Sequence, residues 1–149
     1  SARQGPVALR QVLALKARLV GLRLVPAGTP VGYGGTFVTT RPSRLALLPL
    51  GYADGLAREL WNGAPVLLRG VRAPIVGVVS MNQTVVDATD VPGAMLGDEV
   101  VLLGAHGDER LCPEDRVGPG GSAYEVTTLL RSALPRRFLG GDEAAVPSR

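Results

Sequence analysis

Glycine and proline interrupt this chain at short intervals, and no other feature of the sequence restricts its fold as strongly. The 149 residues include 20 glycines and 12 prolines, nearly twice the usual share of these two residue types. Glycine adopts turn conformations easily, and proline lacks the backbone N–H that helices and central strands need. The chain therefore leaves little room for long helices and favours short strands joined by turns.

Apolar and polar residues alternate in short runs between these turns, a pattern typical of half-buried strands. In the first run, residues 13–24, the alternation changes phase at Gly21, which indicates a β-bulge and places Leu24 on the apolar face. Further strands are expected at residues 36–40, 44–50, 66–68, 73–79, 84–88 and 99–103. Short strands at this spacing predict a mainly all-β, barrel-like domain rather than alternating βαβ units.

Two short helical segments are expected near the C-terminus. Pro113 can occupy the first position of a single turn that covers residues 113–117. Ser122 and Glu125 have the spacing of a capping box, which predicts a helix that continues to about Ser132.

Length and composition indicate one globular domain. Hydrophobic residues make up 46% of the chain and charged residues 19%, a balance typical of a folded core and not of disorder. We interpret the chain as a leader, a β domain and a flexible tail, which cover residues 1–8, 9–139 and 140–149.

Charge and cysteine content restrict the partners and the compartment. The net charge is +3, the basic residues are spread along the chain, and only six residues are aromatic. A nucleic-acid site normally needs clustered charge and stacking aromatics, so we expect no nucleic-acid partner. No apolar run approaches the roughly 20 residues of a membrane helix, and no signal-peptide pattern precedes the domain. The lone Cys112 cannot form an internal disulfide, and together these features favour the cytoplasm and no membrane partner.

Few residues of this chain suit catalysis or metal binding. His106 is the only histidine and falls in a predicted turn, and with one histidine and one cysteine a closed zinc site is not possible, so we expect no metal. Tyr33, Tyr52 and Tyr124 each lie beside residues typical of turns or caps. Flanking glycines allow a backbone to approach a ligand or another chain closely. The pattern leaves two interpretations open, because the rings either cover a barrel mouth or act as exposed functional phenols.

Six segments occur in an order and at a spacing that are typical of one known family. They are LALKARL at 13–19, VGYGGTF at 31–37, LPLGYADG at 48–55, RAPIVGVVSMNQ at 72–83, GDEV at 97–100 and YEV at 124–126. Together they resemble the C-terminal β domain of alanine racemase, a pyridoxal-phosphate enzyme that interconverts L- and D-alanine for peptidoglycan supply. The resemblance implies that the chain is one part of an enzyme, without the N-terminal barrel domain whose lysine binds the cofactor. Alone, the chain is then expected to be inactive and to bind no pyridoxal phosphate.

The resemblance also implies a homodimer, in which this domain contacts both its own barrel domain and the barrel domain of the partner subunit. Tyr33 matches the catalytic tyrosine that takes the α-proton of L-alanine in the partner's active site. Met81 matches the residue whose backbone N–H binds the substrate carboxylate. Tyr52 and Arg58 match the narrow corridor through which the amino-acid substrate reaches the site. Tyr124 matches the residue that hydrogen-bonds the cofactor phosphate within its own subunit.

The sequence departs from the family pattern directly after Met81, where Asn82 replaces the usual aspartate. Asparagine keeps the shape and a carbonyl acceptor but loses the charge, which would weaken an ionic contact to the partner barrel. Asn82 is therefore a candidate for a supporting role beside the site. The single lysine, Lys16, lies on a predicted strand and is expected to face solvent, whereas a Schiff-base lysine needs a desolvated pocket.

Two alternative functions remain open at this stage. The parent protein is either a racemase for serine or for a broader range of amino acids, or a related decarboxylase, because side-chain specificity depends largely on the barrel domain. Alternatively, the domain is a non-catalytic β-barrel module that binds protein or nucleic acid.

Overall fold

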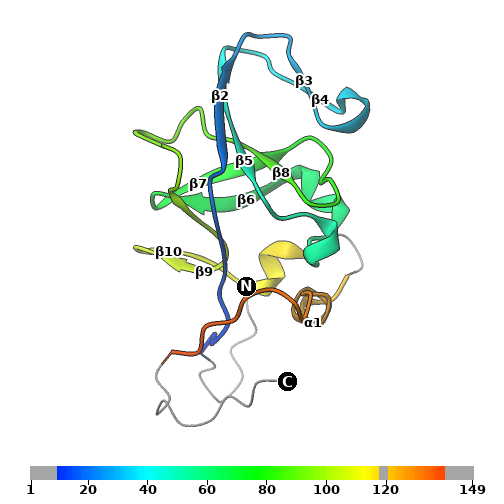
Figure 1. Ribbon diagram of the computed structural model, residues 1–149, viewed down its shortest axis with the longest axis vertical. Helices are drawn as coiled ribbons and strands as arrows, with labels where there is room; N and C mark the ends of the chain where they lie inside the picture. Colours follow the sequence, from blue (N-terminus) through cyan, green and yellow to red (C-terminus); the bar gives the residue numbers. More distant parts are fainter. Residues whose placement is uncertain (1–9, 118–120, 140–149) are drawn as a thin grey trace.

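The computed structural model describes residues 10–117 and 121–139 (Figure 1). The predicted leader, residues 1–8, and the predicted tail, residues 140–149, lie outside the described residues. The strands are β1 (Leu15–Arg18), β2 (Gly21–Val25), β3 (Pro30–Val31), β4 (Phe37–Val38), β5 (Ser43–Leu48), β6 (Asn62–Leu68), β7 (Val71–Val76), β8 (Thr84–Asp87), β9 (Glu99–His106) and β10 (Glu109–Leu111). The helical elements are the 3-10 turns η1 (Tyr33–Gly35), η2 (Tyr52–Asp54), η3 (Arg58–Trp61) and η4 (Pro113–Arg116) and the helix α1 (Ala123–Thr128).

Eight of these strands form one antiparallel sheet, in which neighbours follow the order β1-β9-β6-β7-β8-β5-β2 and β10 pairs with β9. The sheet curls into a half-barrel, and β3 and β4 form a separate small ribbon beyond its upper end (Figure 1). α1 lies at the opposite end of the molecule from this ribbon (Figure 1). The prediction of a mainly β, barrel-like domain with a short helix near the C-terminus is confirmed.

The phase change at Gly21 marks an exchange of partner strands. β1 pairs with β9 and β2 pairs with β5, so the chain passes from one end of the sheet to the other between Arg18 and Gly21. The placement of Leu24 on the apolar face was wrong, because its side chain is exposed while the next residue, Val25, is buried. β2 is the last strand of the sheet, and the described chain leaves this side chain of β2 uncovered.

The hydrophobic core lies inside the curl of the sheet. Fully buried members come from the central strands and include Ala46, Leu48, Val66, Leu68, Ile75 and Val86. A second, smaller cluster of Leu67, Val101 and Leu111 lies on the other face of β6 and β9, where β10 covers it. Strands β6 and β9 are therefore apolar on both faces, and their sequence lacks the clean alternation of a half-buried strand.

The predicted helical segments are present, and one is shorter than expected. η4 begins at Pro113, and α1 is capped by Ser122, whose Oγ accepts a hydrogen bond from the Tyr124 N–H at 3.3 Å. α1 ends at Thr128 and does not continue to Ser132. The Arg131 N–H donates to the carbonyl of Asp54 at 3.1 Å, so the chain beyond α1 bonds to the η2 turn instead of extending the helix. No helix in the described parts of the chain is long and apolar enough to cross a membrane.

Candidate functional site

The turn that carries Tyr52 is fixed directly to the turn that carries Met81. The Tyr52 N–H donates to the carbonyl of Ser80 at 3.0 Å, and the Ala53 N–H donates to the carbonyl of Met81 at 2.9 Å. Gly51 permits this approach, because a Cβ at that position would lie 2.2 Å from the Ser80 carbonyl oxygen. The glycine before Tyr52 is therefore required for tertiary contact between the two turns.

The turn that carries Tyr33 is packed against the strand end that leads to Met81. A Cβ at Gly32 would lie 2.8 Å from the backbone nitrogen of Val78, and a Cβ at Gly77 would lie 2.9 Å from the carbonyl oxygen of Val31. Gly32 and Gly77 both have positive φ, of 76° and 71°, a conformation that favours glycine. Residues 77–78 lead directly into the Met81 turn, so the three turns that carry Tyr33, Tyr52 and Met81 adjoin one another.

The predicted site side chains on these turns are exposed. The exposed fractions are 71% for Tyr33, 44% for Tyr52 and 55% for Met81, and Asn82 is exposed as well. The Arg58 guanidinium lies over the Tyr52 ring at 5.6 Å from the centroid, a cation–π contact that orients both groups. The side chains of Tyr33 and Tyr52 are thus accessible, and whether they act as functional phenols stays a prediction.

Asp54 organises the Tyr52 turn, and the sequence analysis did not identify it. Its Oδ2 accepts a hydrogen bond from the Gly51 N–H at 3.0 Å, while its backbone carbonyl accepts from Arg131 beyond α1. A Cβ at Gly55 would lie 2.3 Å from the carbonyl oxygen of Leu129, so the same turn packs closely against the chain after α1. The spacing of Gly51 and Asp54, three residues apart, is the signal that could have identified this side-chain cap.

Tyr124 lies on a different element from the other site residues. It belongs to the first turn of α1 and is 81% exposed, and its carbonyl accepts hydrogen bonds from the hydroxyls of Thr127 and Thr128. α1 and the β3–β4 ribbon beside η1 lie at opposite ends of Figure 1. The structure therefore brings Tyr33, Tyr52 and Met81 to adjoining turns and leaves Tyr124 on a separate surface.

The remaining candidate groups do not assemble a site. Lys16 Nζ lies 2.7 Å from Glu99 Oε1, and both side chains are more than 40% exposed, as in an ordinary surface ion pair. The prediction that His106 lies in a turn was wrong, because β9 extends to His106, which pairs with Glu109 of β10. Within residues 10–117 and 121–139, no three histidine, cysteine, aspartate or glutamate side chains gather as metal ligands do.

The curled antiparallel sheet places this chain in the class of β half-barrel domains. Its three adjoining turns carry exposed side chains. Residues 12–138 match the family described as the alanine racemase C-terminal domain, and the chain belongs to that family. It is 52% identical over 122 residues to the alanine racemase of Syntrophobacter fumaroxidans, which covers 81% of this chain and 32% of that protein. Alanine racemase from Streptomyces coelicolor has the same fold, with a TM-score of 0.83 and 36% identity over 89% of this chain and 35% of that one. Alanine racemase from Bartonella henselae, whose structure contains covalently bound pyridoxal phosphate, matches with a TM-score of 0.75 and 38% identity. The match covers 85% of this chain and 35% of that one.

The chain thus spans about a third of the length of the relatives that it matches. Its described residues do not fit a complete site for pyridoxal phosphate. The single lysine is held at the surface by Glu99 and lacks the desolvated surroundings that a Schiff-base lysine needs. The exposed hydroxyl of Tyr124 is available as a hydrogen-bond donor for a phosphate group.

Proposed function

We propose that this chain is the C-terminal domain of an alanine racemase and supplies groups to an active site that another part of the enzyme completes. The membership of the family supports this function. One structural observation supports it further: adjoining turns, joined by backbone hydrogen bonds and close glycine contacts, leave Tyr33 and Met81 exposed together. Exposed groups on well-fixed turns suit a site that is shared between two protein surfaces.

In this proposal, the Tyr33 hydroxyl oxygen exchanges a proton with the α-carbon of L-alanine. Racemisation requires proton exchange on both faces of that carbon, and one base cannot readily reach both, so the second base comes from outside this chain. Pyridoxal phosphate, bound elsewhere in the enzyme, supplies the electron sink that stabilises negative charge on the α-carbon. No charged residue lies beside Tyr33 in the sequence.

Met81 binds the substrate carboxylate through its backbone. Its carbonyl accepts a hydrogen bond from Ala53, whereas its N–H donates to no group within the described residues. An N–H that is fixed in place and free to donate is suited to a carboxylate oxygen. Asn82, directly beside it, adds no negative charge that would repel that carboxylate.

Tyr52 and Arg58 line the corridor to the site, where the guanidinium attracts the carboxylate of the incoming amino acid. The cation–π contact between Arg58 and Tyr52 keeps both side chains on the same side of the corridor. The Tyr124 hydroxyl would donate a hydrogen bond to the cofactor phosphate in the same subunit. The enzyme acts as a cytoplasmic homodimer and supplies D-alanine for peptidoglycan.

The test is the substitution Tyr33→Phe in the complete enzyme that contains this chain. Loss of a positioned acid or base typically lowers a rate by about 10²–10⁴, and we expect a loss of this size for L-alanine. The measurement is exchange of the α-hydrogen in D₂O, followed by NMR separately for L- and D-alanine. The first exchange from D-alanine should be retained much better, because the other base serves that face.

The matched control is Thr40→Val, which removes an exposed hydroxyl that has no role in the proposed site and should leave α-hydrogen exchange largely intact. Exchange from L-alanine at the wild-type rate in the Tyr33→Phe enzyme would refute the assignment. Turnover of alanine and serine by the same enzyme distinguishes an alanine racemase from a serine or broad-specificity racemase.

A further inference from the structure

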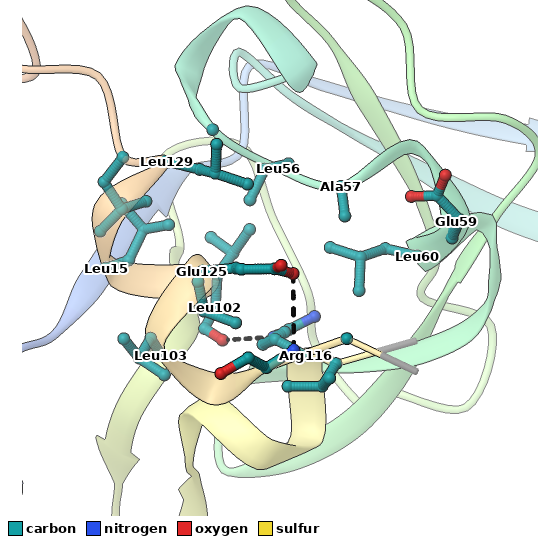
Figure 2. A pocket seen from close by; sticks show the side chains of 16 residues that line it. Leu15, Leu56, Ala57, Glu59, Leu60, Leu102, Leu103, Arg116, Glu125 and Leu129 are labelled. Carbon is teal, nitrogen blue, oxygen red and sulfur yellow. Dashed lines mark hydrogen bonds between the residues drawn. The ribbon is translucent and has the colours of Figure 1, made fainter. Parts of the chain in front are cut away.

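A cavity of about 410 Å³ lies between α1, η3, η4 and β9 (Figure 2). Its size falls within the range of small-molecule sites in proteins, about 300–1,000 Å³. The walls are mainly leucine side chains, among them Leu15, Leu56, Leu60, Leu102, Leu103 and Leu129. None of the tyrosines or methionines lines it, so the proposed racemase function assigns no role to this cavity.

One cation lies among these apolar walls. Arg116, from η4, is 5% exposed and lines the cavity, and its Nε donates to the carbonyl of Leu102 at 2.7 Å (Figure 2). Its two terminal nitrogens, Nη1 and Nη2, are buried and have no hydrogen-bond partner within the described residues. No carboxylate in the described parts of the chain forms an ion pair with it.

This guanidinium remains charged at neutral pH. Burial lowers the pKa of Arg116 to about 10, against a smaller opposing effect of Asp115, and a pKa of 10 still leaves the group protonated. A buried charge without a counterion or hydrogen-bond acceptors is costly, so the two free nitrogens favour an anion beside them.

The geometry of the free groups selects the kind of anion. With Nε occupied by Leu102, the free edge of the guanidinium is the pair Nη1 and Nη2, which matches the two oxygens of a carboxylate. Glu59 and Glu125 also line the cavity (Figure 2), and their negative charge disfavours a dianion such as phosphate more strongly than a monocarboxylate. The leucine walls favour a ligand with a hydrocarbon part.

We propose that this cavity binds a small apolar monocarboxylate. Its carboxylate pairs with Nη1 and Nη2 of Arg116, and its hydrocarbon part packs among the leucine side chains. The cavity reaches the end of the Tyr52 turn at Gly55, but the side chains of Tyr33, Tyr52 and Met81 do not line it. Binding in the cavity can therefore be tested apart from the racemase function.

The test is titration of the 149-residue chain with hexanoate, followed by calorimetry and by the NMR signal of the Arg116 Nε–H. We expect saturable binding to one site and a shift of that signal. Hexan-1-ol, which keeps the tail without the charge, and inorganic phosphate should each bind at least about tenfold more weakly.

Two variants locate the site. Arg116→Met keeps the length of the side chain without the charge and should weaken hexanoate binding by about tenfold or more. Arg72→Met is the matched control, because Arg72 is an exposed arginine paired with Glu109 at 2.6 Å, and this variant should bind hexanoate as the wild type does. If the wild-type chain shows no saturable binding of hexanoate, or binds hexan-1-ol or phosphate equally well, the proposal is overturned. Undiminished binding by a folded Arg116→Met chain overturns it as well.

Discussion

Replacement of Gly51 by alanine tests the close approach on which the candidate site depends. The backbone φ of Gly51 is −147°, an extended conformation that alanine adopts without strain. The new Cβ would nevertheless lie 2.2 Å from the Ser80 carbonyl oxygen and 2.4 Å from the Met81 carbonyl oxygen. Both atoms belong to the backbone and cannot rotate away as a side chain can. The Tyr52 turn must therefore move off the Met81 turn.

The expected cost follows from the contacts that this movement breaks. The hydrogen bonds from Tyr52 to Ser80 and from Ala53 to Met81 are worth about 0.5–1.5 kcal/mol each. Overpacking of a tight contact adds about 1–3 kcal/mol. We expect Gly51→Ala to lower the free energy of unfolding by about 2–6 kcal/mol, measured by urea unfolding of the 149-residue chain with linear extrapolation.

Gly70→Ala is the control for the loss of a glycine as such. Gly70 has a φ of +77°, and no atom lies within 4 Å of the point that a Cβ would occupy there, so alanine meets backbone strain alone. That strain costs about 1–2 kcal/mol. If Gly51→Ala costs no more than Gly70→Ala, the two turns are not held as closely as the structure indicates, and the reasoning fails.

Three further predictions concern stability. Arg116→Met should raise the free energy of unfolding at neutral pH by about 2 kcal/mol. The lowered pKa of Arg116 corresponds to a cost of about 3 kcal/mol for keeping the buried guanidinium charged. The variant removes this cost but also loses the hydrogen bond to Leu102, which offsets about 1 kcal/mol of the gain. Since that pKa is lower in the folded chain, wild-type stability should rise as the pH passes upward through about 10, and urea unfolding should show no such rise for the variant. Ser122→Ala removes the cap of α1 and should cost about 0.5–2 kcal/mol by urea unfolding, whereas Ser122→Gly should cost only a few tenths.

Local signals in the sequence predicted much of the fold. Period-two alternation located β5, β8 and most of β7, and the spacing of Ser122 and Glu125 located the start of α1. The partners of β1 and β2 could not be predicted in this way, because alternation fixes which side chains share a face but not which strand pairs with which. The extension of β9 to His106 depends on its hairpin with β10, and β10 has only three residues, too few for a periodic pattern.

The candidate site could also be predicted only in part from the sequence. Tyr33, Tyr52 and Met81 could be named because each stands in a distinctive local motif. The contact between their turns could not be predicted, because it depends on atoms far apart in the sequence. Arg116 follows two acidic residues in PEDR, which locally resembles a solvated run of charges. Its burial arises from tertiary packing, which includes the contacts of η4 with α1 and β6 and the bond from Arg116 to Leu102 of β9.

The adjoining turns combine a fixed backbone with exposed side chains, and this combination favours a function that needs a second protein surface. The backbone of these turns is fixed, because glycines at positions 32, 51 and 77 allow contacts that any Cβ would prevent. The side chains of Tyr33 and Met81 on the same turns remain exposed and add little to the core. Stability of the isolated domain does not explain this arrangement, since exposed apolar side chains contribute little to folding. Groups that are held in place before their partner arrives lose less conformational freedom on association. A backbone fixed in this way, with Tyr33 and Met81 exposed on it, therefore suits the shared active site proposed for this domain.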